Sequence, residues 1–194
     1  MSTSPPTPFF GARFSLYPMS DRYVPLILDA IEPLPRSGLE VETDDVSTFI
    51  GGDRDAVFSE LERAFAAVAR TGTHAVMTVL LSHGCPGEVY CEAPGGVQAP
   101  APATAKDGKS GVEVSCQWSL YPLGVPEYMD VIYREIDRTK KARVFAKGRH
   151  FVSQLRGDLH DVLGGVRASF DAACRDVPHV TAHLVLSANS PTKE

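Results

Sequence analysis

The chain has 194 residues, 43% of them hydrophobic and 22% charged, with a formal net charge of −5 at pH 7. This composition is ordinary for a globular protein, and the acidic balance argues against a nucleic-acid partner, which favours a basic face. Apolar runs fall short of the roughly 20 residues of a membrane helix, and residues 1–6 lack the features of a secretory signal. We therefore expect a cytoplasmic protein that is not membrane-embedded.

The first half of the chain predicts the element order β-α-β-β-α-β. Apolar residues alternate with small or polar ones up to Pro18, which is typical of a strand. Val57, Phe58 and Leu61 recur at the period of an amphipathic helix. The predicted elements are a strand at 11–17, a helix capped by Ser20 or Asp21, strands at 39–43 and 46–50, a helix capped by Asp53 and a strand at 74–82.

The second half repeats this order. Residues 14–19 match residues 118–123 around a shared Ser-Leu-Tyr-Pro, and 52–53 match 157–158 at an offset of 105. The predicted elements are a strand at 114–121, a helix from Glu127, strands at 143–146 and 149–155, a helix from Asp158 and a strand at 179–187.

This duplication predicts an α+β protein of two tandem ferredoxin-like (βαββαβ) units, each an ACT-like sandwich. The predicted boundaries are 11–87 for the first domain, 88–112 for a linker rich in Pro, Ala and Gly, and 113–191 for the second. Units this small bury limited surface and leave sheet edges to cover. We therefore expect the units to pack together and the chain to form a homodimer.

The repeated Ser-Leu-Tyr-Pro, the segment 84–87 and the segment 186–191 together resemble the Ykof family of thiamine- and hydroxymethylpyrimidine-binding proteins. The resemblance spans 11–191. It implies a pyrimidine-binding site in each domain, no catalysis, and a role beside thiamine-precursor uptake, with a transporter as a possible partner. It implies no cofactor and no metal; thiamine is the ligand.

Carried over residue by residue, the resemblance assigns ligand binding to Leu16 and Thr48 in the first domain and to Leu120 and Ser153 in the second. The leucines would offer backbone atoms and the hydroxyls would donate and accept hydrogen bonds, beside aromatic rings at 14, 17, 118 and 121. The family pattern expects a histidine where this chain has Asp45, whereas His150 fits. We therefore expect sites of unequal affinity.

Other interpretations remain open. Without the resemblance, Leu16 and Leu120 would be interpreted as core residues, and Thr48 and Ser153 as ordinary strand residues. Duplicated domains of this fold also suit an ACT-like regulatory module that senses another small metabolite.

Cys85 beside His83 is compatible with a thiol enzyme or half of a metal site. The second repeat lacks this pair, and the four cysteines do not recur between repeats, so we expect free thiols in a reducing compartment.

Overall fold

The computed structural model describes residues 9–84 and 108–192. The first repeat consists of β1 (Phe10–Pro18), α1 (Tyr23–Ile31), a 3-10 turn η1 (Leu34–Arg36), β2 (Glu40–Thr43), β3 (Thr48–Gly51), α2 (Arg54–Ala69) and β4 (Ala75–His83). The second consists of β5 (Glu113–Leu123), α3 (Tyr128–Lys141), β6 (Phe145–Arg149), β7 (Val152–Asp158), α4 (Leu159–Asp176) and β8 (His179–Ala188). The predicted element order is confirmed in both repeats, and no predicted end is displaced by more than three residues.

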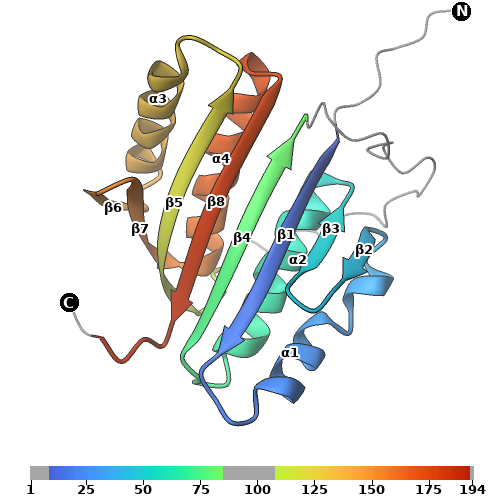
Figure 1. Ribbon diagram of the computed structural model, residues 1–194. Coiled ribbons are helices and arrows are strands. Elements are labelled where there is room, and N and C mark those ends of the chain that lie inside the picture. Colours follow the sequence, from blue (N-terminus) through green and yellow to red (C-terminus); the bar gives the residue numbers. More distant parts are fainter. Residues whose placement is uncertain (1–8, 85–107, 193–194) are drawn as a thin grey trace, which may run out of the picture.

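The strands form one antiparallel sheet in the order β2-β3-β1-β4-β8-β5-β7-β6 (Figure 1). Within each repeat the first strand lies between the third and the fourth, which is the split βαβ arrangement and confirms the predicted α+β, ferredoxin-like fold. The repeats join where β4 pairs with β8, from Ala75 opposite Ala188 to His83 opposite Val180. The two units thus pack together, as expected, and they do so by forming a single continuous sheet.

The hydrophobic core lies between the sheet and the helices. Alternate residues of β1, including Phe10, Phe14 and Leu16, are buried on the face that α2 covers, because successive strand residues point to opposite faces. Helices α2 and α4 run side by side behind the sheet (Figure 1). The ring of Phe10 lies 6.1 Å from that of Phe58 and 5.8 Å from that of Phe170. Since Phe170 belongs to α4, the two repeats share one core.

Polar contacts also join the repeats. The Arg54 guanidinium of α2 donates to Asp171 of α4 at 2.5 Å and lies 4.6 Å above the Phe10 ring. The Asn189 side chain, just after β8, donates to the carbonyl of Ala69, the last residue of α2, and to that of Thr73 in the turn that follows. Carbonyls at the end of a helix lack partners within the helix. Asn189 therefore caps the first repeat's long helix from the second repeat.

The helix caps were predicted with mixed success. The Asp53 carboxylate accepts from the Ala56 N–H and the Asp158 carboxylate accepts from the His160 N–H, so both predicted aspartate caps are confirmed. The predicted cap by Ser20 or Asp21 is wrong, because α1 begins after Arg22 and has no side-chain cap. Proline at position 25 lacks an N–H, which leaves one donor fewer to satisfy in that first turn.

The domain boundaries can be compared with the described ranges. Most of the expected linker lies outside them, but Ser110 and Gly111 donate backbone hydrogen bonds to the Asp158 carboxylate, and Val112 is buried. These residues therefore pack against the second repeat. Among the helices in the described ranges, none has the length and apolar character needed to cross a membrane.

Candidate functional site

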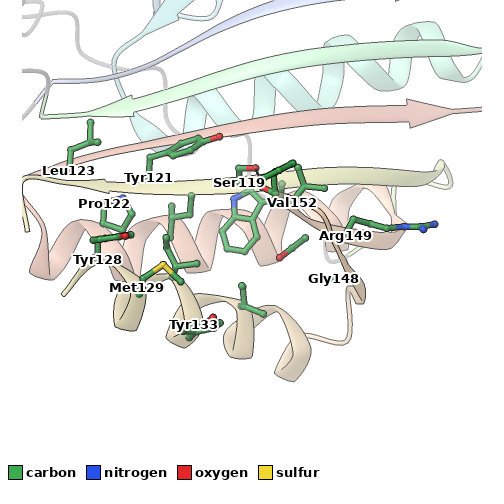
Figure 2. Close-up of a pocket in the computed structure, with 16 residues that line it drawn as sticks. Ser119, Tyr121, Pro122, Leu123, Tyr128, Met129, Tyr133, Gly148, Arg149 and Val152 are labelled. Carbon is green, nitrogen blue, oxygen red and sulfur yellow. Dashed lines mark hydrogen bonds between the residues drawn. The ribbon is translucent and has the colours of Figure 1, made fainter. Parts of the chain in front are cut away.

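A cavity of about 700 Å³ lies in the second repeat between β5, α3 and the β6–β7 hairpin. Residues 118–123 of β5 form one wall, and Tyr128, Met129 and Tyr133 project toward it from α3 (Figure 2). Gly148 and Arg149 lie where the hairpin closes one end (Figure 2). A mostly apolar, aromatic-lined hollow with few polar groups is typical of a small-molecule site.

The cavity exists because β7 is shorter than β5. Pairing between them stops at Trp118 opposite Ser153, so residues 119–123 of β5 have no strand partner on that side among the described residues. In the first repeat, pairing of β1 with β3 likewise stops at Phe14 opposite Thr48. Each repeat therefore has a free strand edge beside its first helix.

The direction of the backbone groups follows from their alternation along the strand. The Phe10 carbonyl accepts from Gly52 on the β3 side, whereas the Met19 N–H donates to His74 on the β4 side. Even-numbered residues of β1 therefore direct N–H and C=O toward β3. Beyond the end of β3, the groups of Leu16 face the open edge.

Leu120 has the same placement in β5. The Val112 carbonyl accepts from Leu159 on the β7 side, so even-numbered residues of β5 direct their backbone groups toward β7 and, past its end, toward the cavity. The side chains of Leu120 and Leu16 are themselves buried, 5% and 7% exposed. Each leucine can therefore be a core residue through its side chain and still offer its backbone groups to a ligand.

The structure brings Leu120 and Ser153 together, since both line the cavity. Leu16 and Thr48 occupy the matching positions of the first repeat, and Thr48 and Ser153 are both buried. The Thr48 hydroxyl lies 3.1 Å from the Thr43 hydroxyl.

The sequence analysis did not identify a role for Ser15 and Ser119, which precede Leu16 and Leu120. The Ser15 hydroxyl donates to the Val46 carbonyl at 2.8 Å, and the Ser119 hydroxyl donates to the Phe151 carbonyl at 3.1 Å. Both bonds tie the tip of the hairpin to the unpaired end of the first strand. The recurrence of serine in the repeated motif was the available signal.

The two hairpins carry different charges. Asp44 accepts from the backbone N–H groups of Val46 and Ser47 and from the Arg13 guanidinium. The backbone hydrogen bonds, then the charge of Arg13, hold the pKa of this carboxyl below its usual value. Asp45 is exposed beside it.

The matching hairpin of the second repeat is basic. Lys147, Arg149 and His150 are exposed, and the Phe151 ring is 97% exposed at its tip. The Arg149 guanidinium also reaches Gln154 at 3.4 Å. Asp45 and His150 hold equivalent places.

The thiols in the described ranges are poor nucleophiles. Burial raises the pKa of Cys116 to about 12 and that of Cys174 to about 11. Cys85 and Cys91 lie outside these ranges. The Nδ1 atom of His83 lies 3.1 Å from the Arg54 guanidinium, and burial, then the charge of Arg54, lowers the pKa of this histidine. His83 therefore contacts the same guanidinium that binds Asp171 of the second repeat.

Metal binding has no visible site in the same ranges. Within residues 9–84 and 108–192, no group of three or more His, Cys, Asp or Glu side chains could hold a metal ion.

Comparisons with known proteins agree with the duplicated architecture. The model of the YKOF-related family matches residues 9–88 and again residues 113–193. The chain is 34% identical over 186 residues to a protein of Bacillus subtilis (strain 168) named "Putative HMP/thiamine-binding protein YkoF", covering 95% of this chain and 92% of that protein. Two matches to one family model, each spanning one repeat, are what a tandem duplication predicts. The chain belongs to the YKOF-related family.

Proposed function

We propose that the protein binds thiamine or its hydroxymethylpyrimidine moiety without chemical conversion, at one site per repeat. The observation that carries the proposal is the cavity where the free edge of β5 at Leu120 meets the hydroxyl of Ser153. The name of the Bacillus subtilis relative supports the choice of ligand.

The chemistry of the ligand suits this arrangement. An aminopyrimidine carries an exocyclic amine donor beside ring-nitrogen acceptors, and the unpaired edge of a strand offers a carbonyl and an N–H at similar spacing. The Ser153 hydroxyl adds a group that both donates and accepts. The flat ring would lie against Trp118 and the α3 side chains Met129 and Tyr133, which supply apolar surface.

The first repeat is proposed to bind in the same way through Leu16 and Thr48. Its α1 residues Tyr23, Val24 and Ile27 stand where the second repeat has Tyr128, Met129 and Ile132. The free edge of β1 begins at the equivalent residue. Two sites per chain are therefore expected.

We infer that the protein is cytoplasmic and supports uptake or salvage of a thiamine precursor, with a transporter as a partner. We also propose a homodimer, because the outer face of the sheet exposes Tyr17, Leu80, Tyr121 and Leu123 by 41–49%. Light scattering at micromolar concentration would contradict the dimer if it returned the 20.9 kDa of one chain.

A regulatory module for another metabolite is the second candidate, favoured by the duplicated ACT-like sandwich. Calorimetric titration with thiamine, hydroxymethylpyrimidine and a panel of amino acids separates the two. Binding of both pyrimidines with two sites per chain is expected. Binding of an amino acid and of neither pyrimidine would replace the proposal, and loss of thiamine detected by mass spectrometry would show an enzyme.

A further inference from the structure

One row of three residues crosses the sheet beside each site. In the first repeat the row is Thr43, Thr48 and Phe14, which are Cα partners on β2, β3 and β1. Paired residues of neighbouring antiparallel strands project their side chains to the same face, so each row forms a single surface.

In the second repeat the row is Gly148, Ser153 and Trp118, on β6, β7 and β5. All three positions differ from the first repeat, although the register is the same.

In the row of the first repeat, the two hydroxyl groups can hydrogen-bond to each other. The hydroxyls of Thr43 and Thr48 lie 3.1 Å apart, within hydrogen-bonding distance, and the Phe14 ring has no polar atom. A hydroxyl that is already bonded to another has one hydrogen-bonding site fewer to offer a ligand. The Thr43 side chain also fills the space beside Thr48.

The row of the second repeat has empty space beside Gly148. Gly148 lines the cavity, and a Cβ atom added to it would meet no other atom within 4 Å. The buried Ser153 side chain lines the cavity, and within the described ranges the Trp118 indole N–H is buried without a hydrogen-bond partner. A buried donor without a partner is costly and unusual in a folded protein. This row therefore has both the space and the polar groups for a further contact with a ligand.

We propose that position 148 sets the ligand specificity of the second site. A small polar substituent on the ligand ring, such as the hydroxyl of a hydroxymethyl group, occupies the space beside Gly148 and exchanges a hydrogen bond with Ser153. In the first site the Thr43 side chain takes this space. The second site therefore selects a hydroxymethyl group and the first does not; this inference rests on the proposed function.

Two pyrimidines test the inference: hydroxymethylpyrimidine, and the same ring with a methyl group in place of the hydroxymethyl group. Trp118 is the single tryptophan of the chain and lines the second cavity, so its fluorescence reports that site alone, while calorimetry reports both. In the native protein we expect the second site to prefer the hydroxymethyl ring by about tenfold or more. The first site is expected to bind the two rings within about threefold of one another.

Matched substitutions then exchange the position between repeats. Gly148→Thr places a side chain in open space and should reduce the second site's preference to about threefold or less. Thr43→Gly should create a preference at the first site, and Thr43→Ser, which keeps the hydroxyl, should not. Thermal unfolding checks that each variant is folded, and Gly148→Ala offers a milder change should Gly148→Thr be unstable.

The outcomes separate this inference from the proposed function. Equal binding of both rings at the second site, or a preference that survives both Gly148→Thr and Gly148→Ala, overturns the role of position 148 and leaves thiamine-related binding intact. Failure of both rings and of thiamine to bind overturns both.

Discussion

The two repeats share a frame and differ in what their hairpins bring to it. In both repeats, the first strand extends beyond the end of the third strand. A serine of the first strand donates a hydrogen bond to a carbonyl at the tip of the hairpin. The first hairpin is acidic and held by Arg13, which contacts Asp44 at 2.8 Å and Glu42 at 3.4 Å. The second is basic and ends in an exposed phenylalanine. The two repeats thus have the same strand register but different side chains around the site.

The helices beside the two sites also differ, in length and in what they bury. Helix α1 has 9 residues and stops before Pro33, whereas α3 has 14. The longer helix buries Glu135 completely, with Arg134 and Arg138 each contacting its carboxylate at 2.7 Å. A buried carboxylate needs such partners. The second site therefore has the more extensive helical wall.

The largest expected difference between the repeats concerns the helix caps. The Asp53 carboxylate accepts a hydrogen bond from the Ala56 N–H, whereas the Asp158 carboxylate accepts from Ser110, Gly111 and His160. Asp53→Ala should lower the free energy of unfolding by about 1 kcal/mol, the usual value of a cap. Asp158→Ala should lower it by about 2–4 kcal/mol, because several buried donors lose their acceptor. Chemical denaturation of both variants measures the difference, and equal losses would contradict it.

The same aspartate predicts an acid dependence of stability. Burial alone would raise the pKa of Asp158, but the hydrogen bonds from Ser110, His160 and Gly111 outweigh burial and hold this pKa below its usual value. A carboxyl whose pKa is lower in the folded state stabilises the fold above its unfolded pKa, and this stability is lost as the pH falls through the folded pKa. Unfolding measured between pH 6 and 2 should show this loss in the native protein and a smaller one in Asp158→Asn.

The hydroxyls test whether the sites are independent. Thr48→Val should remove the first site and Ser153→Ala the second, each at a cost of about 1–3 kcal/mol in binding, or roughly 5- to 150-fold in affinity. Tryptophan fluorescence should lose its ligand response only in Ser153→Ala. One site per chain in the native protein, or loss of both sites in either variant, would contradict independent sites.

The hairpin charges should produce a smaller effect. Asp45 would attract the thiazolium cation of thiamine, and a protonated His150 would repel it. Asp45→Asn should weaken thiamine at the first site by about two- to fivefold at low salt, and His150→Asp should strengthen it at the second by a similar factor, since exposed charges interact weakly. Titrations at about 20 mM and 500 mM salt should show the effect shrinking. The uncharged pyrimidine serves as the control and should not respond.

The smallest effect is expected at a residue that has no counterpart in the second repeat. Cys85→Ala should leave both affinities within about twofold, because the proposed binding requires no nucleophile. Calorimetry gives the affinities and mass spectrometry follows the ligand. Consumption of thiamine by the native protein and not by this variant would establish a thiol enzyme.

The sequence predicts much of this fold for physical reasons. Strand alternation and helical periodicity depend on local residue order, and Asp53 and Asp158 are typical caps. The joining of β4 to β8 could not be predicted, since either edge could have been covered in other ways. The cavity was also beyond prediction, because it depends on where β7 stops beside β5. Leu120 and Ser153 came from a family resemblance, and Gly148 needed the register of three strands.

The central β4–β8 ladder has a consequence for how the chain folds. All residues of the first repeat are available once β4 ends at His83, but β8 begins only at His179. At synthesis rates of about 5–20 residues per second, the edge of β4 waits on the order of 5–20 s for its partner. An unpaired, apolar strand edge invites pairing with another chain. The central seam of the finished sheet is therefore an unpaired edge during synthesis, and its closure is the step at which two nascent chains could exchange repeats.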